Sequence, residues 1–131
     1  MVKSAFLVVG PQSSGTRLVT RLLLAGGCFG DGGHAQRMDD LRFAERPAPI
    51  VLRRSIPHGG AWPNLVDIVD RMRGAGYGVQ VLVTVRDRTA MARSQVQAGH
   101  VPDIESAMHE IGRAWVHLGV HLLAARAPVV V

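Results

Sequence analysis

The stretch Ala5–Ala25, AFLVVGPQSSGTRLVTRLLLA, decides the fold. Its first five residues are continuously apolar and stop at Gly10, which is typical of a buried parallel strand. The segment Gly10–Gly15 has the composition of a loop. Thr16–Ala25 then predicts a helix that Gly26 and Gly27 end. The apolar residues of this helix share one face: Leu18, Leu22 and Ala25, with Val19 and Leu23 beside it.

The same alternation of strand and helix continues to the last residue. Further strands are predicted at Pro49–Leu52, Val79–Val85 and Val129–Val131, and further helices at Leu65–Arg73, Thr89–Ala98 and from Ile104, with a short one near Met38–Ala44. Arg53–Trp62 is polar and predicts a loop. The helix from Ile104 carries an apolar seam: Ile104, Met108, Ile111, Trp115, Leu118 and Leu122. The pattern indicates an α/β class with a mostly parallel sheet.

Length and composition favour one domain over residues 1–131. The chain has 131 residues, of which 47% are hydrophobic, enough for a buried core. It ends on three valines with no turn residue after them, so we expect it to be the N-terminal part of a longer chain, a domain truncated at its C-terminus. No apolar run approaches the roughly 18 residues of a membrane span. The single Cys28 excludes an internal disulfide framework and favours a reducing, cytoplasmic setting.

The charge indicates an anionic ligand. The net charge is +5, and fourteen of the fifteen basic residues are arginines, whose planar fork suits phosphate and sulfate oxygens. Codon bias and a solvated basic face are the alternative explanation. Nucleic acid is disfavoured as a partner, because the basic residues are scattered and aromatic residues are few.

The loop after the first strand is typical of a phosphate cradle. Gly10 and Gly15 have the spacing of a Walker A loop, and backbone amides at a helix N-terminus bind anions. The next two positions, however, are Thr16 and Arg17 rather than Lys and Ser or Thr. This argues against an ordinary ATPase or kinase, but the hydroxyls of Ser13, Ser14 and Thr16 and the charge of Arg17 still suit an anion. The expected fold is thus a three-layer, P-loop-type domain.

Arg86 follows the strand Val79–Val85, and Ser94 comes eight residues later. Because ligands bind at the carboxyl ends of parallel strands, Arg86 and the first loop can share one cleft. In these two motifs, Ser13–Leu18 (SSGTRL) and Val85-Arg86-Asp87 with Ser94, the chain resembles the sulfotransferase family. The match covers roughly residues 5–20 and 79–99, and the rest only by element order.

The resemblance implies the donor 3′-phosphoadenosine 5′-phosphosulfate and transfer of a sulfuryl group, without a metal, to an unknown acceptor hydroxyl or amine. It places Ser13, Ser14, Gly15, Thr16 and Arg17 at the 5′-phosphosulfate, and Arg86 and Ser94 at the 3′-phosphate. Many family members carry a Lys in the first loop to assist the leaving group, where this chain has Gln12 or Ser13. Arg17 or Arg53 is a possible substitute. The family's later segment rich in Arg, Lys and Gly has no counterpart here.

The catalytic base is expected after the second strand. His58 is the first candidate, because a neutral imidazole accepts a proton near pH 7. Ser55 lies nearer the family's usual spacing, and a surface-loop role for His58 stays open. Further candidates precede this strand: Asp39, Asp40 and Glu45.

Two alternatives to a sulfotransferase remain open on sequence alone. One is a phosphotransferase or nucleotide hydrolase with a degenerate P-loop, and the other is a nucleotide-binding module without chemistry. His117 and His121 are four residues apart on a predicted helix, but no third ligand is evident, so no metal site is expected.

Overall fold

The computed structural model describes residues 3–30 and 49–131. In these residues five strands form one sheet in the order β2-β3-β1-β4-β5, and every neighbouring pair is parallel. The elements, in chain order, are β1 (Lys3–Pro11), α1 (Thr16–Ala25), β2 (Phe29–Gly30), β3 (Ile50–Ile56), α2 (Leu65–Gly74), β4 (Tyr77–Val83), α3 (Arg88–Gln97), α4 (Ile104–Ala125) and β5 (Val129–Val130).

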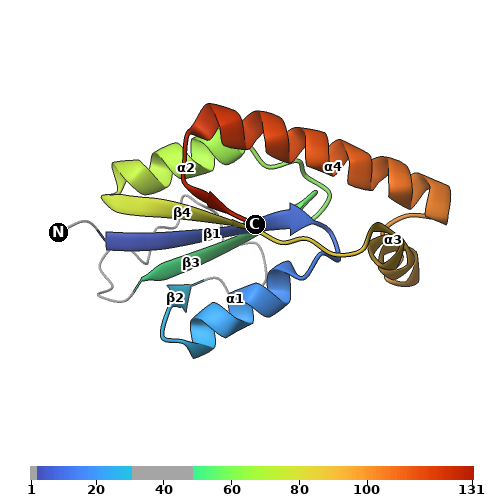
Figure 1. Cartoon of the computed structure of the whole chain (residues 1–131), viewed down its shortest axis with the longest axis horizontal. Helices are drawn as coiled ribbons and strands as arrows, with labels where there is room; N and C mark the ends of the chain where they lie inside the picture. The colour runs from blue at the N-terminus through green and yellow to red at the C-terminus, as the bar shows by residue number, and fades with distance from the viewer. Residues whose placement is uncertain (1–2, 31–48) are drawn as a thin grey trace.

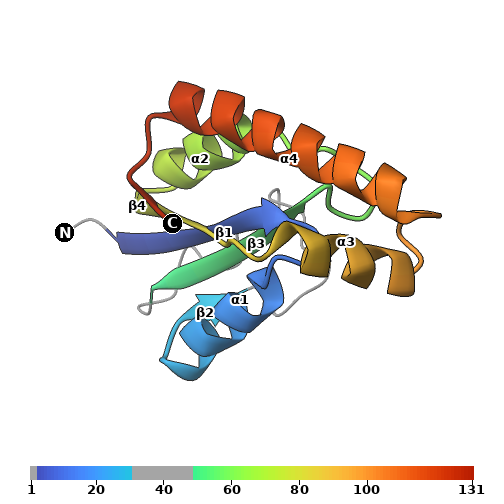
Figure 2. The same ribbon diagram turned by 45° about the vertical axis from the view of Figure 1, so that its right-hand side comes forward.

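The helices cover both faces of this sheet. Figures 1 and 2 show α1 on one face and α2 with α4 on the other, while α3 lies against α4 beyond the carboxyl end of β1. The prediction of an α/β chain with a mostly parallel sheet is confirmed, and the arrangement is compatible with a three-layer domain. Within the described residues, no helix combines the length and the apolar character needed to cross a membrane.

β1 is the central strand, with β3 on one side and β4 on the other. The chain leaves β1 toward α1 on one face and leaves β3 toward α2 on the opposite face (Figure 1). Neighbouring parallel strands whose connections leave in opposite directions open a crevice at their carboxyl ends, where α/β proteins bind ligands. The topology therefore predicts a ligand crevice beside the segments that follow Pro11, Ile56 and Val83.

The main core lies between the sheet and the pair α2 and α4. Leu7, Val9, Val81 and Leu65 are each fully buried in it, and each such side chain contributes roughly 1.5–3 kcal/mol through loss of apolar surface from water. A second cluster, built around Met91 and Ile111, fastens α3 to α4. The helix α3, which follows β4, is thus packed against α4.

The predicted apolar face of α1 is wrong. Leu18 and Leu22 are 63% and 62% exposed, and the side chains that α1 buries against the sheet are Thr16 and Thr20. Thr20 can be buried because its hydroxyl donates to the Thr16 carbonyl oxygen at 2.7 Å. The helix therefore exposes Leu18 and Leu22 to solvent and packs Thr16 and Thr20 toward β1 and β3.

The predicted loop over Arg53–Trp62 is also wrong in its first four residues, because β3 continues to Ile56. Arg53 and Arg54 are each only 6% exposed, at the strand end that reaches the crevice. On α4, Ile104 is exposed, and the buried line runs through Ala107, Ile111, Ala114 and Leu118. The predicted short helix near Met38–Ala44 lies outside the described residues.

Candidate functional site

The loop between β1 and α1 has a backbone that its sequence explains. Gly15 has φ +102° and Ser13 has φ +67°, both in the left-handed region, which glycine tolerates best. Gly10 is required for a different reason, because a Cβ there would collide with the hydroxyls of Thr84 and Ser14. The loop is therefore turned tightly at Ser13–Gly15 and pressed against the end of β4 at Gly10.

Three consecutive loop residues are tied to the segment formed by β4 and α3. The Gln95 Nε2 donates to the Gln12 carbonyl oxygen at 2.9 Å. Arg86 Nη1 donates to the Ser13 carbonyl oxygen at 3.2 Å. The Ser14 hydroxyl lies 2.6 Å from that of Thr84. The two sequence motifs are therefore one physical unit.

The N-terminus of α1 differs from those of the other described helices. Gly15 is its cap residue and no side chain caps its first turn. By contrast, α2, α3 and α4 are capped by Asn64, Asp87 and Asp103, whose side chains each accept a backbone N–H. The amides of the first turn of α1 therefore carry positive potential without a side-chain acceptor.

A cavity of about 950 Å³ opens over this turn, between α1, the end of β3 and α3. Its lining residues are Gln12, Ser13, Gly15, Thr16, Arg17, Leu18, Arg21, Arg53, Ser55, His58, Gly59, Gly60, Arg86, Ser94, Ala98 and His100. Of the predicted site residues that the structure describes, every one is among them except Ser14. Ser14 is buried, its amide donates to the Pro11 carbonyl oxygen at 3.1 Å and its hydroxyl meets Thr84. Ser14 therefore holds the loop against the end of β4 and does not line the cavity.

The cavity is strongly cationic. Four arginines line it, namely Arg17, Arg21, Arg53 and Arg86, and no carboxylate of the described residues does. Arg53 is buried and its Nη1 donates to the Thr16 hydroxyl at 3.3 Å. A buried guanidinium beside a helix N-terminus favours an anion with several oxygens.

Arg86 and Ser94 lie on the α3 side of the cavity. Arg86 is exposed, and the bond to Ser13 uses one of the five N–H donors of its guanidinium. Ser94 is half-buried on α3, in the cavity wall. The prediction that these residues and the first loop share one cleft agrees with this geometry.

His58 lines the opposite wall, in a rigid turn. Its backbone N–H and carbonyl pair with Ala61 at 2.7 and 3.0 Å, through Gly59 and Gly60. The Ser55 backbone N–H donates to His58 Nδ1 at 3.2 Å. An amide nitrogen only donates, so Nδ1 is an acceptor and neutral His58 carries its proton on Nε2 in this arrangement.

Sequence reasoning missed Arg21, His100 and Gln95. Arg21 follows Arg17 by four residues and so shares its helix face, a signal that was available. Gln95 was not predictable, because its partner is a backbone carbonyl of a remote loop. The base candidates Asp39, Asp40 and Glu45 lie outside the described residues.

His117 and His121 are stacked with ring centroids 3.9 Å apart, on α4 and away from this cavity. Burial, and then the charge of His117, lower the pKa of His121. In the ranges 3–30 and 49–131 no three His, Cys, Asp or Glu side chains are grouped so that they could hold a metal ion. Comparisons with protein-family models, curated proteins and solved structures found no match to the chain.

Proposed function

We propose that the chain is a sulfotransferase-like domain, which moves a sulfuryl group from 3′-phosphoadenosine 5′-phosphosulfate to an acceptor hydroxyl or amine. One observation carries the proposal. Four residues of the first loop line one cavity with Arg86 and Ser94, although the two groups are 69 residues or more apart in sequence; the four are Ser13, Gly15, Thr16 and Arg17. This is the arrangement that the resemblance implies for a donor whose ribose carries a 5′-phosphosulfate and a 3′-phosphate.

The two ends of the donor are assigned to the two walls of the cavity. The first-turn amides of α1, the Thr16 hydroxyl and Arg17 would hold the 5′-phosphosulfate, and Arg53, next to Thr16, adds charge there. Arg86 and Ser94 would hold the 3′-phosphate. The cavity volume of about 950 Å³ falls in the range of small-molecule and cofactor sites.

In this reaction the bond between sulfur and the bridging oxygen of the 5′-phosphate breaks, and a bond between sulfur and the acceptor atom forms. The acceptor's proton goes to a base, and 3′,5′-bisphosphoadenosine leaves. Negative charge grows on the bridging oxygen, so the amides and guanidinium groups around Thr16 stabilise the transition state, by about 3–4 kcal/mol for each well-placed donor.

His58 is the proposed base, and Ser55 is the residue that lets it act. With its proton on Nε2, the ring cannot accept another there. When the proton is on Nδ1, it can donate to the Ser55 hydroxyl, which lies 3.2 Å away and itself donates to the Pro57 carbonyl oxygen at 2.9 Å. Nε2 is then an acceptor. Ser55 therefore offers a partner to Nδ1 in both tautomers, through its amide in one and its hydroxyl in the other, and the second tautomer takes the acceptor away from the Ser55 amide.

The function is tested by titrating the protein with 3′,5′-bisphosphoadenosine, ATP, and ATP with magnesium. We expect the bisphosphate to bind most tightly, with no need for magnesium, and labelled sulfate to move to an acceptor. Preference for magnesium ATP would instead indicate a phosphotransferase or hydrolase. Bisphosphate binding without transfer to any acceptor offered would indicate a binding module.

Ser55→Ala tests the base separately from donor binding. It keeps the amide bond to Nδ1 and removes the hydroxyl, so the base-competent tautomer loses about 1 kcal/mol, and transfer slows about fivefold. Affinity for the bisphosphate should stay within twofold, and the ring ¹⁵N shifts of His58 should move toward the Nε2-protonated form. A rate equal to that of the unmodified protein would remove Ser55 from the mechanism.

A further inference from the structure

Gln95 is a buried polar residue in the second half of α3. It is 2% exposed and does not line the cationic cavity, although its neighbour Ser94 does. Its Oε1 atom is buried and has no hydrogen-bond partner within the described residues. A buried amide with one unbonded atom costs the fold more than an apolar side chain of the same size. Packing alone therefore does not account for a glutamine here, and its Nε2 hydrogen bond is what sets it apart.

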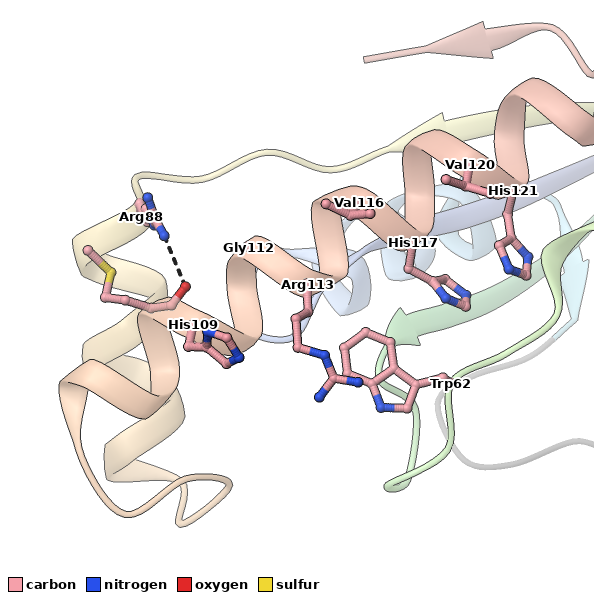
Figure 3. A pocket seen from close by; sticks show the side chains of 10 residues that line it. Trp62, Arg88, His109, Gly112, Arg113, Val116, His117, Val120 and His121 are labelled. Carbon is pink, nitrogen blue, oxygen red and sulfur yellow. Dashed lines mark hydrogen bonds between the residues drawn. The ribbon is translucent and has the colours of Figure 1, made fainter.

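The helix that carries Gln95 is held firmly against α4. Figure 3 shows Arg88, at the start of α3, where its Nη2 donates to the Met108 carbonyl oxygen of α4 at 3.0 Å. A buried apolar cluster also joins the two helices. Beyond the end of α3, the His100 N–H donates to the Gln95 carbonyl oxygen at 3.0 Å. The Gln95 side chain therefore extends from a fixed backbone.

The Nε2 bond of Gln95 fixes one peptide of the loop before α1. Nε2 donates to the Gln12 carbonyl oxygen at 2.9 Å, and the Gln12 N–H donates to the Ile56 carbonyl oxygen of β3 at 3.3 Å. Gln12 is thus held from α3 and from β3 at the same time. The peptide between Gln12 and Ser13 is trans, so its C=O and N–H point in opposite directions. The Ser13 N–H therefore points away from Gln95.

The Ser13 N–H is a donor that the loop itself does not use. Ser13 lines the cationic cavity, and its N–H makes no hydrogen bond within residues 3–30 and 49–131. The next N–H, that of Ser14, is taken by the Pro11 carbonyl oxygen. The Ser13 N–H thus joins the uncapped first-turn amides of α1 as a donor to an anion, since successive backbone N–H groups at a tight turn bind anions.

We propose that Gln95 is a positioning residue for the 5′-phosphosulfate. Its bond to the Gln12 carbonyl holds the loop peptide in the orientation in which the Ser13 N–H donates to an oxygen of that group. Gln95 does not line the cavity, so its bond to the loop can persist when the donor is bound. The identity of the anion rests on the proposed function, whereas the orientation of the Ser13 N–H does not.

Gln95→Met tests this role, because methionine has a similar length and adapts to its surroundings but has no N–H to donate. The probes are adenosine 5′-monophosphate and adenosine 3′-monophosphate, which carry the two phosphates singly. The Kd of the 5′-compound should rise about tenfold, and that of the 3′-compound should stay within twofold. The downfield shift of the Ser13 amide proton that the 5′-compound causes in a ¹H–¹⁵N spectrum should be lost.

This pattern separates positioning from a merely structural role. Gln95 is next to Ser94, which is assigned to the 3′-phosphate, so a general disturbance of α3 would weaken the 3′-compound at least as much as the 5′-compound. That result would overturn the proposal. Gln97→Met is the matched control, because Gln97 is exposed on the same helix and does not line the cavity. It should leave both Kd values within twofold.

Inorganic sulfate distinguishes a failure of this inference from a failure of the proposed function. If no adenosine phosphate binds the unmodified protein, the proposed function is wrong, and sulfate then decides about Gln95. A Ser13 amide shift that sulfate causes in the unmodified protein but not in Gln95→Met supports the positioning role. The role is overturned if the shift persists in the variant, or if neither sulfate nor the 5′-compound shifts Ser13 in the unmodified protein. Gln95→Leu, which also lacks a donor, repeats the test if Gln95→Met does not fold.

Discussion

Replacing Arg86 by alanine separates the binding of a 3′-phosphate from the stability of the fold. In the free protein Arg86 is exposed, and within the described residues its guanidinium donates one hydrogen bond, to the Ser13 carbonyl oxygen. The loop keeps its other ties, through Ser14 to Thr84 and through Gln12. We therefore expect the free energy of unfolding to change by less than about 1 kcal/mol.

Binding should change far more. A charged hydrogen bond to a phosphate is worth about 1.5–3 kcal/mol, so the Kd for 3′,5′-bisphosphoadenosine should rise about 10- to 150-fold. Isothermal titration at low ionic strength with a chelator present measures this directly. Arg86→Lys keeps the charge but loses the planar fork. Its Kd should lie between that of the unmodified protein and that of Arg86→Ala.

Arg93→Ala is the matched control, because Arg93 is an exposed arginine on α3 that does not line the cavity. It changes the net charge by the same amount and should leave the Kd within twofold. An unchanged Kd for Arg86→Ala would refute the assignment of the 3′-phosphate to Arg86. An equal loss in both variants would show that only the overall charge matters.

Two further predictions concern the fold. Gly10→Ala should destabilise the protein by about 1–3 kcal/mol in a denaturant titration, because the added Cβ would collide with Thr84, whereas Gly74→Ala meets open space and should be neutral or better. Stability should fall as the pH drops below about 6.5, because the pKa of His121 is lowered from 6.5 in the fold, so the unfolded chain binds the proton first. Melts at several pH values check this, and His121→Asn, which keeps an acceptor for the Leu65 N–H, should flatten the dependence.

The order of the elements was predictable because apolar runs and glycine-rich breaks alternate along the chain. The error at α1 has a physical origin. Periodicity assigns Leu18 and Leu22 to the core, yet the helix buries Thr16 and Thr20, since a threonine whose hydroxyl bonds to the preceding turn can lie against a sheet at little cost. The periodicity of apolar residues takes no account of that hydrogen bond within the helix.

The error at β3 arose at the site itself. Arg53, Arg54 and Ser55 are polar and predict a loop, but they continue a buried strand. Polar residues at the carboxyl end of an inner strand such as β3 suit a ligand crevice, so a rule based on hydropathy fails there. Of the four arginines that line the cavity, Arg17, Arg53 and Arg86 were named from the sequence, and Arg21 was missed although it shares a helix face with Arg17.

The ties between the loop and the β4–α3 segment bear on how an anion would bind. Ordering a flexible residue costs about 1–2 kcal/mol, and Gln12, Ser13 and Ser14 are each already held by a bond to that segment. An anion that binds there therefore does not have to order the loop. Its affinity would come from the arginines and the first-turn amides of α1. Arg86 is one of these ties, so a phosphate that recruited its remaining donors, as proposed, would bridge the two motifs. The 3′-phosphate of a donor would thus act on the loop proposed to hold the 5′-phosphosulfate of the same donor.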